Sequence, residues 1–583
     1  MMKKLIHIAI FIGVVTLIYF LSERFFFRLD LTSEKRYSLS ENTKNLLKGL
    51  DDELNVTIYL DGDLNAGFLR LRKATVEMLD EFDAYAGKRV KYQFDNPSAG
   101  ATKEAREKKY DELEKEGIRG IMVYDHQEEG EARQKIVYPW AKISYKGKTR
   151  NINLLKNIPR KSGEENLNIS IETLEYELTD ALRIITTTKV PKVVFLEGHD
   201  EYPEMLVADF MQTLSHYYRV DRGVMSGKVD ELKDYEAVII AAPMKKFSEV
   251  DKFVIDQYIM QGGRVLWVLD GARITLDSLS TSSRTIGIDN DVNLVDQLFN
   301  YGVRINANLL QDVQCSLIPV NTAREGDAPK YEPMSWYYSP LLLTVPVHPV
   351  SKNVAPVKTE FVSSLDFVND NEKVKKIPLL VTSTGTHIQN VPSIVSMEVI
   401  NVEQNGFYFN TRNVMAAASL EGIFPSAFAN RMIPQGVTGA NEIIKESKPT
   451  KMIVVADGDV ICNEVQGKGA NAMPLALGYD RYMNQRFGNS DFLLNAVNYL
   501  TDDDGWMQLR SREIQMRLLN KARVKGMNKF FKVFNIVVPI LSILLFGLFF
   551  HFIRKWKYTK EISVSQPVTE NQIATEEQPE EEK

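Results

Sequence analysis

Two long apolar segments, one near each end of the 583-residue chain, constrain its fold more than any other feature. They are "LIHIAIFIGVVTLIYFL", residues 5–21, and "VFNIVVPILSILLFGLFFHFI", residues 533–553. At the helical rise of about 1.5 Å per residue they would extend about 26 and about 32 Å, close to the roughly 30 Å apolar core of a bilayer. Pro539 and Gly547 do not exclude the second segment, because membrane helices tolerate both residues. The sequence therefore predicts two transmembrane helices.

Other interpretations of these segments are open. Either segment could be a buried core helix, and residues 5–21 could be a cleaved signal peptide. The sequence "SERFFFRLD" that follows is bulky and charged, however, and lacks the small-x-small pattern of a cleavage site. A cysteine for lipid attachment is also missing there. We therefore expect an uncleaved anchor.

The flanking charges favour cytoplasmic ends, without deciding the orientation. Lys3 and Lys4 precede the first span, and four basic residues follow the second: Arg554, Lys555, Lys557 and Lys560. Basic residues also occupy the opposite flanks, and long domains cross membranes largely regardless of charge. We expect residues 1–4 and 554–583 in the cytoplasm, with a large domain in the periplasm and the spans in the inner membrane.

Composition excludes several classes of function. A net charge of −6 over this length gives no reason to expect a nucleic-acid partner. The two cysteines, Cys315 and Cys462, occur in no CxxC or zinc-ligand spacing, so we predict neither a metal site nor a cofactor. Whether the two cysteines form a disulfide is left open by the sequence.

The first part of the periplasmic region has the pattern of an α/β subdomain. Residues 22–45 form a juxtamembrane segment in which Ser40 is expected to cap a helix. Within residues 46–188, the alternating stretch at 54–60, the helical pattern at 67–87 and the alternating stretch at 90–97 form a βαβ unit. This arrangement predicts a thioredoxin-like subdomain that lacks the CxxC motif.

Residues 189–503 show the rhythm of a doubly wound α/β domain. Apolar strands are expected at residues 192–196, 235–243, 264–271 and 449–460, separated by amphipathic helices. One of those helices should begin at Ser248, with Asp251 completing a capping box. We predict a mostly parallel, flavodoxin- or glutaminase-like sheet with an irregular insertion at about 313–445. A basic juxtamembrane segment, residues 504–532, and a disordered acidic tail, residues 554–583, complete the chain.

Titratable residues gather where the predicted strands end. "VVFLEGHDE" places His199, Asp200 and Glu201 after one strand, and "VVADGDV" places Asp457 and Asp459 after another. In open α/β sheets ligands bind at this edge, so these residues and Asn463 are our candidate ligand-binding residues. Each cluster also has a structural interpretation: a polar loop lip for the first, and an Asp-Gly turn for the second. A third interpretation is a base, a metal ligand or a divalent-ion site.

The motifs of common enzymes are missing from the sequence. It contains no Gly-x4-Gly-Lys-Ser/Thr loop for ATP phosphates, and neither cysteine stands in a Gly-x-Cys-x-Gly elbow. We therefore expect a protein that is not an enzyme. The alternative is a membrane-tethered hydrolase or glutaminase-like enzyme that uses His199 and the nearby carboxylates, and a second alternative is a periplasmic scaffold.

An ordered set of stretches resembles one family along nearly the whole chain. The stretches are "RLDLTSEKRYSLSENTKNLL", "VTIYLDGDLNAGFLRL", "LEGHDE", "VVADGDVICN" and "FGNSDFLLNAVNYL". Together they resemble the ABC-transporter auxiliary family, in particular its gliding-motility-associated members from Bacteroidetes-type bacteria. Unlike a usual solute-binding protein, this sequence keeps two predicted anchors.

The resemblance implies an accessory subunit, sometimes called a substrate-binding protein, in a system for gliding motility and linked secretion. Its implied partners are an ABC permease, a separate ABC ATPase, membrane lipid and a periplasmic substrate or motility protein. On the second span, Asn535, Pro539 and Ser542 are candidate contacts with a neighbouring membrane helix. The resemblance implies no catalytic residues.

Overall fold

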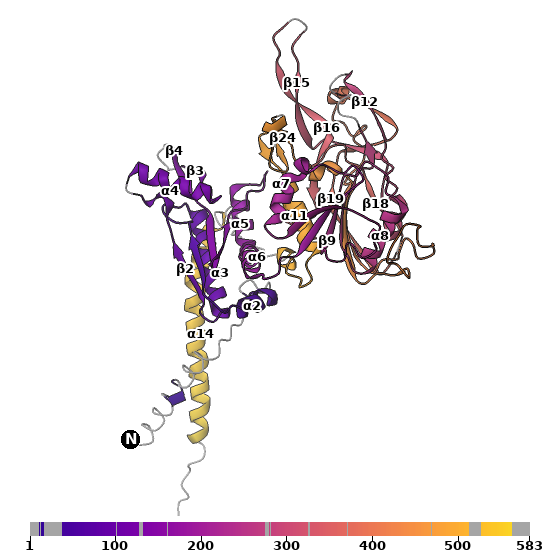
Figure 1. Cartoon of the computed structure of the whole chain (residues 1–583). Helices are drawn as coiled ribbons and strands as arrows, with labels where there is room; N and C mark the ends of the chain where they lie inside the picture. Colours follow the sequence, from indigo (N-terminus) through magenta and orange to yellow (C-terminus); the bar gives the residue numbers. More distant parts are fainter. Residues whose placement is uncertain are drawn as a thin grey trace, which may run out of the picture. The chain divides into compact units, whose positions relative to one another are not determined.

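The computed structural model describes two separate units of the chain (Figure 1). The described residues are 11, 13, 14, 16, 38–511 and 526–562, except 101, 127–131, 160, 275–278, 280, 281, 325, 326, 370 and 468. One unit is Met1–Ile514 and the other is Gln515–Lys583. Most of the predicted first span lies outside the described residues and stays a prediction. Of the tail predicted as disordered, residues 554–583, the part up to residue 562 is helical, which corrects that prediction, because the last turns of the long helix continue past the apolar segment. The rest of the tail lies outside the described residues.

The second unit contains one long apolar helix, α14 (Asn528–Ile562). Among the described residues it is the one helix long and apolar enough to cross a membrane, with a candidate span at Asn528–Lys557. The predicted helix at residues 533–553 is therefore confirmed as a helix. The Ser542 hydroxyl donates a 2.8 Å hydrogen bond to the Val538 carbonyl within this helix.

The first unit begins with a small α/β part around a four-stranded sheet ordered β2-β1-β5-β6. Strands β1 and β2 are parallel, whereas β1–β5 and β5–β6 are antiparallel pairs. The predicted βαβ unit is present, because α3 connects β1 to β2. The elements are α2 (Glu41–Lys48), β1 (Leu54–Ile58), α3 (Ala66–Tyr85), β2 (Val90–Phe94), α4 (Lys103–Lys115), β3 (Ile121–His126), β4 (Ala132–Val137), β5 (Trp140–Tyr145), β6 (Lys148–Asn153), α5 (Gly163–Glu172) and α6 (Leu174–Thr186).

Predicted helix starts agree with the structure in this part and beyond. The Ser40 side chain accepts a hydrogen bond from Thr43 N and caps α2, as the sequence predicts. The Ser248 side chain likewise accepts from Asp251 N at the start of α8 (Glu249–Met260). Side-chain oxygens are preferred at these positions because they satisfy free amides of the first helical turn.

The large sheet has five parallel strands in its first half, in the order β8-β7-β9-β10-β23. This order, with the second strand outside the first, is one of the two common doubly wound arrangements. Its elements are β7 (Lys192–Glu197), α7 (Glu204–Ser215), β8 (Arg219–Val224), β9 (Ala237–Ala241), α8, β10 (Val265–Val268), α10 (Val295–Tyr301), β23 (Thr450–Val455) and α11 (Asn489–Leu500).

The sheet is mixed rather than mostly parallel, which corrects the sequence prediction. Next to β23 it continues through antiparallel strands in the order β22-β19-β16-β15. These strands come from the region predicted as an irregular insertion. They are β15 (Cys315–Asn321), β16 (Tyr331–Thr344), β17 (Val357–Lys358), β19 (Val374–Val381) and β22 (Met415–Gly422).

Proline explains why these strands are hard to recognise in the sequence. Pro378 lies inside β19 at an irregularity in its pairing with β22, and Pro340 lies inside β16 opposite a shift in β15. Proline cannot donate to a strand ladder and is tolerated mainly at edges and bulges. A strand that contains it therefore loses the usual sequence pattern.

Shorter pairs of strands surround the large sheet. They are β11 (Ala272–Arg273), β12 (Arg284–Asp289) and β21 (Ser393–Ser396) in one sheet, and the pairs β13 (Val303–Ile305) with β18 (Leu365–Phe367), β14 (Asn308–Asp312) with β20 (Thr386–Asn390), β24 (Val465–Gln466) with β25 (Met473–Pro474), and β26 (Tyr479–Asp480) with β27 (Gln485–Arg486).

Both faces of the parallel half are covered by helices, as expected for a doubly wound sheet (Figure 1). Phe195 on β7 belongs to the core that contains α7 and α11. Trp267 on β10 belongs to the opposite core, which contains α8 and α10. Because alternate residues of a strand face opposite sides, continuous apolar strands are buried on both faces. The carboxyl ends of β7, β9, β10 and β23 remain aligned at one edge.

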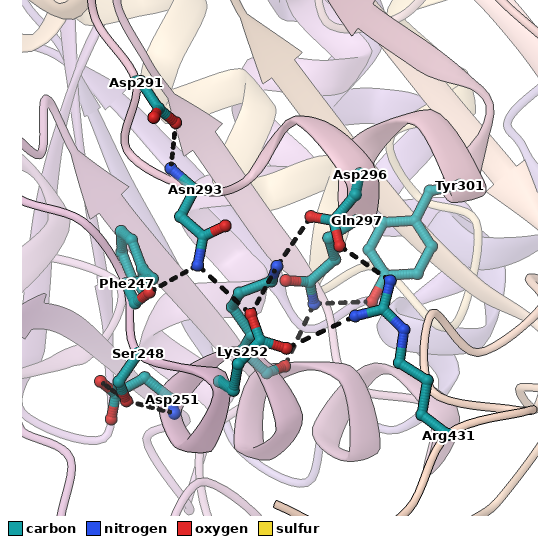
Figure 2. Close-up of polar contacts among 11 residues, drawn as sticks. Phe247, Ser248, Asp251, Lys252, Asp291, Asn293, Asp296, Gln297, Tyr301 and Arg431 are labelled. Carbon is teal, nitrogen blue, oxygen red and sulfur yellow. Dashed lines mark hydrogen bonds and ion pairs between the residues drawn. The ribbon is translucent and has the colours of Figure 1, made fainter.

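A square of four charged side chains fixes α8 against α10 (Figure 2). Lys252 Nζ lies 3.1 Å from Glu249 Oε1 and 2.7 Å from Asp296 Oδ1. Arg431 closes the square from outside, at 3.4 Å from Glu249 Oε2 and 3.0 Å from Asp296 Oδ2. We call these four residues the charge square.

Candidate functional site

Four carboxyl groups, one buried (Asp457) and three half-buried, converge at the carboxyl edge of β10 and β23. Asp270 follows β10, Asp457 and Asp459 follow β23, and Glu360 follows β17. Gly458 N donates a 2.6 Å hydrogen bond to Asp270 Oδ1. Glu360 N and Asp459 N donate to the two oxygens of Asp457, at 3.2 and 3.0 Å. We call Asp270, Glu360, Asp457 and Asp459 the carboxylate cluster.

Glycine at position 458 is required for this packing. A Cβ atom there would collide with the Asp270 carboxylate and with the Ala242 side chain. The segment after β23 is a turn in which the Asp457 side chain accepts from Asp459 N and caps a short 3-10 helix, Gly458–Ile461. The turn interpretation of this Asp-Gly-Asp stretch is therefore consistent with its geometry.

Burial and mutual repulsion raise the pKa values of the carboxylate cluster. Burial and the charge of Asp459 raise the pKa of Asp270 to about 7, and the same two causes raise the pKa of Glu360 to about 7. Burial raises the pKa of Asp457 well above its usual range, and burial also raises the pKa of Asp459. Carboxyls that share a buried site cannot all ionise, so the cluster holds protons near neutral pH.

A polar cavity of about 110 Å³ opens beside the carboxylate cluster. Its acidic lining is balanced in part by Lys358, whose Nζ lies 2.9 Å from Asp480 Oδ2 and 3.4 Å from Glu464 Oε1. A cavity of this size admits only a small ligand or part of a larger one. Its lining residues are Lys358, Thr359, Glu360, Asp459, Cys462, Asn463, Glu464, Gly478, Tyr479 and Asn489.

Asn463 and Tyr202 connect the cavity wall to α7 and to the turn after β7. Asn463 Nδ2 donates to the Met205 carbonyl at 3.0 Å, and its Oδ1 accepts from Asp209 N at 3.2 Å. The Tyr202 hydroxyl donates to Asp459 Oδ1 at 2.7 Å. These bonds hold the loop after β23 in place, and they use both polar atoms of the Asn463 side chain.

The His199 ring lies between the carboxylates of Glu201 and Asp251, and we call these three residues the clasp. Its Nδ1 lies 3.1 Å from Glu201 Oε1, and its Nε2 lies 3.2 Å from Asp251 Oδ2. The ring stacks on Phe247, with the centroids 3.6 Å apart and the planes at 11°. Burial lowers the pKa of His199, but the hydrogen bonds to Asp251 and Glu201 outweigh burial and raise that pKa to about 9.

The clasp joins the turn after β7 to the first turn of α8. Asp251 also accepts a 2.6 Å hydrogen bond from the Ser248 hydroxyl, so one carboxylate holds both the helix cap and His199. Asp200 has a positive φ of 55° and pairs with Lys245 at 2.8 Å. Since both ring nitrogens of His199 are engaged, the imidazolium has no free nitrogen to serve as a base or a metal ligand.

The clasp predicts that His199→Gln is destabilising at neutral pH but nearly neutral in strong alkali. The folded pKa of about 9 exceeds the ordinary 6.5, so the stabilisation is fully present below about pH 6.5 and is lost as the pH rises through about 9. We expect a loss of about 2 kcal/mol at pH 7. Thermal unfolding of both proteins between pH 6 and 10 measures it.

His216→Gln provides the control, because His216 is exposed and should change stability by less than about 0.5 kcal/mol. A His199→Gln difference that stays constant or grows between pH 7 and 10 contradicts a charged histidine in the clasp.

Neither cysteine is arranged for nucleophilic chemistry. Cys315 and Cys462 are both free thiols, so they do not pair with each other. Burial raises the pKa of Cys315 to about 12, and burial together with the charge of Asp459 raises the pKa of Cys462 further. A thiol that stays protonated is a poor nucleophile. Among the residues that the structure describes, no group of three or more His, Cys, Asp or Glu side chains is placed to hold a metal ion.

The structure separates the predicted site residues into two groups. Asp459 and Asn463 line the cavity, and Asp457 lies directly behind it in the carboxylate cluster. His199, Asp200 and Glu201 do not line that cavity, although Tyr202 links their turn to Asp459.

Sequence reasoning missed Asp270, Glu360 and Lys358. Asp270 follows an apolar strand in the same way as Asp457, and this repeated signal indicates that the two residues lie close together. Glu360 and Lys358 come from the proline-rich region, where the sequence gives no comparable signal.

The three membrane-helix candidates all lie on α14. Asn535, Pro539 and Ser542 are spaced by four and three residues, so they share one face of the helix. Proline has no amide hydrogen to donate, so the bond that residue 539 would otherwise make to the Asn535 carbonyl is missing.

The chain is similar to two protein families and to an uncharacterized bacterial protein. Residues 190–496 match the model of a family described as an ABC-type uncharacterized transport system, and residues 33–144 match a domain of unknown function. An uncharacterized protein of Borreliella burgdorferi is 20% identical over 564 residues, covering 95% of this chain and 99% of that protein. The solved mmIFT52 N-terminal domain is 14% identical and covers 54% of this chain and 99% of that domain, but its TM-score of 0.30 is too low to support an argument.

Proposed function

Because the chain belongs to the ABC-type uncharacterized transport system family, we propose that it is a non-enzymatic accessory subunit of an ABC transporter that serves gliding motility and linked secretion. The family match over residues 190–496 is the observation that carries this proposal. A transport system of the ABC type implies a permease and an ATPase as partners. The chain itself has no phosphate-binding loop for ATP, so a separate subunit supplies hydrolysis.

Membrane attachment is the second part of the proposal. Helix α14 anchors the chain in the inner membrane beside the permease, and residues 5–21 form a second span. Both ends of the chain then lie in the cytoplasm, and the two α/β parts lie in the periplasm. The long apolar segment and its basic flanks support this arrangement.

The cavity beside the carboxylate cluster is the proposed place for a periplasmic substrate or partner group. It lies at the strand edge where doubly wound sheets bind ligands, and Asp459 and Asn463 line it. A binding role without catalysis agrees with the engaged nitrogens of His199 and the raised thiol pKa of Cys462.

Alanine replacement of His199, Asp200 and Glu201 tests the alternative of a hydrolase. An accessory subunit should keep motility and complex assembly in a variant that still folds, whereas an enzyme that depends on these groups should lose its function with assembly intact. Thermal unfolding of the same variant separates loss of function from loss of the fold.

Co-isolation tests the accessory role itself. The full-length chain, extracted from its own membranes in mild detergent, should bring an ABC ATPase and a multi-span permease with it. A control chain in which residues 533–553 are replaced by an alternating Leu-Ala span of equal length should stay in the membrane but lose the permease. A chain isolated alone under these conditions contradicts the proposal.

A further inference from the structure

Two segments of the first unit that are far apart in the sequence lie next to each other. One is residues 38–48, which includes α2, and the other is residues 502–511, which includes α12 (Gln508–Ser511). Asn42 Nδ2 donates a 2.9 Å hydrogen bond to the Asp504 carbonyl, across 462 positions of sequence. We call residues 38–48 the entry segment and residues 502–511 the exit segment.

The entry segment is fastened to helix α6. Glu175 Oε1 on α6 accepts from Ser40 N at 2.7 Å and from the Thr43 hydroxyl at 3.0 Å. The Thr43 hydroxyl also lies 3.1 Å from the Thr179 hydroxyl, one turn further along the helix. Thr43 is fully buried, so these bonds are shielded from water.

The exit segment folds around one carboxylate. The amides of Gly505, Trp506 and Met507 donate to Asp502, at 2.7, 3.1 and 2.9 Å. Three amide donors hold this turn rigidly and fix the direction of the Trp506 side chain. Trp506 and Met507 are both buried.

Trp506 fastens the exit segment to the same helix. Its ring stacks on Tyr176 of α6, with the centroids 5.5 Å apart and the planes at 12°. The Arg183 guanidinium, also from α6, lies 4.1 Å from the Trp506 ring centroid, and Arg510 lies 4.9 Å from that of Tyr176. Two cations and two rings thus form one continuous stack.

Helix α6 connects this stack to both sheets. Leu178 and Leu182 lie in the core of the small four-stranded sheet, whereas Tyr176 lies in a core of the large sheet. The Tyr217 hydroxyl, at the end of α7, donates to Asp180 Oδ2 of α6 at 3.2 Å. A displacement of α6 should therefore displace the elements packed against it in both α/β parts, because packed elements move as rigid bodies.

We propose that α6 is a mechanical relay that couples the entry segment to the exit segment and passes their displacement to both sheets. This inference rests on the proposed membrane attachment, since the chain leaves the exit segment toward α14 and reaches the entry segment from the predicted first span. Motion of the membrane helices is then transmitted to α6 by both segments, instead of to two unconnected elements.

Hydrogen exchange on the full chain in lipid nanodiscs tests the coupling. Trp506→Ala should speed amide exchange in α2 by about tenfold or more, although the side chains that its ring contacts, Tyr176 and Arg183, lie on α6 and not on α2. Thr43→Val, which removes the hydroxyl bonds to Glu175 and Thr179 of α6, should speed exchange in the exit segment in return, because coupling is reciprocal. Trp336→Ala removes an equally buried tryptophan from β16 and should leave α2 unchanged.

Unchanged exchange in α2 for Trp506→Ala, or in the exit segment for Thr43→Val, overturns the relay. The experiment needs no transporter partner, so its outcome is independent of co-isolation. Failure of the chain to enter nanodiscs would instead contradict the membrane attachment. If Trp506→Ala does not fold, Trp506→Phe keeps the ring stack with a smaller ring and should show the same change with reduced size.

Discussion

Asp270→Asn should make the protein more stable at pH 8, and the gain should shrink steadily as the pH falls to 5. In the wild type the pKa of Asp270 is about 7, above the ordinary 3.8, because the group is buried near Asp459. Folding therefore becomes less favourable as the pH rises from about 4 to 7, when the buried group is forced to ionise. At 1.36 kcal/mol per pKa unit the gain is at most about 4 kcal/mol.

The amide of asparagine can still accept the hydrogen bond from Gly458 N, so the substitution removes charge with little change of shape. Unfolding of the detergent-solubilised full chain at pH 5, 6, 7 and 8 measures the difference from wild type. Asp230→Asn is the matched control, because Asp230 is exposed and should give no pH-dependent difference. An Asp270→Asn difference that does not grow with pH contradicts the protonated carboxylate cluster.

Lys252→Met should destabilise the protein by about 2–3 kcal/mol at pH 7. The Lys252 side chain is only 1% exposed, and its charge is matched by Glu249 and Asp296. Burial raises the pKa of Asp296, but hydrogen bonds from Lys252 and Arg431 hold that pKa below its usual value. Methionine fills a similar volume, so the loss reports the missing ammonium group. Denaturant unfolding of both proteins measures it.

Arg431→Met tests the same charge square from its exposed side. Arg431 is 45% exposed, so water replaces most of its interaction and the loss should stay below about 1 kcal/mol. Equal losses for the two substitutions would contradict the difference in burial on which the prediction depends.

The parallel half of the fold follows from the sequence, and the antiparallel half does not. The apolar runs that became β7, β9, β10 and β23 are continuous because both of their faces are buried, and this pattern is visible in the sequence. Strands such as β16 and β19 contain proline at irregular pairings, and their register depends on neighbours far along the chain. No local pattern records that dependence.

The candidate site was predictable only in part for a similar reason. The positions of His199 and Asp457 beyond strand ends are local facts, and the structure places both there. The partners that decide their chemistry are distant in sequence. Asp251 Oδ2 lies at hydrogen-bond distance from His199 Nε2, and Glu360 N donates to Asp457 Oδ2. Local sequence thus indicates where charged groups gather but not which of them pair.

Photo-cross-linking from α14 in living cells tests the central claim, that this chain meets its permease inside the membrane. Benzoylphenylalanine in place of Asn535 or Ser542 should cross-link to the permease. The same residue in place of Leu544, nine positions from Asn535 and so on the opposite face of the helix, should not. Adducts with lipid alone, with a second copy of the chain, or equally from all three positions would contradict the account.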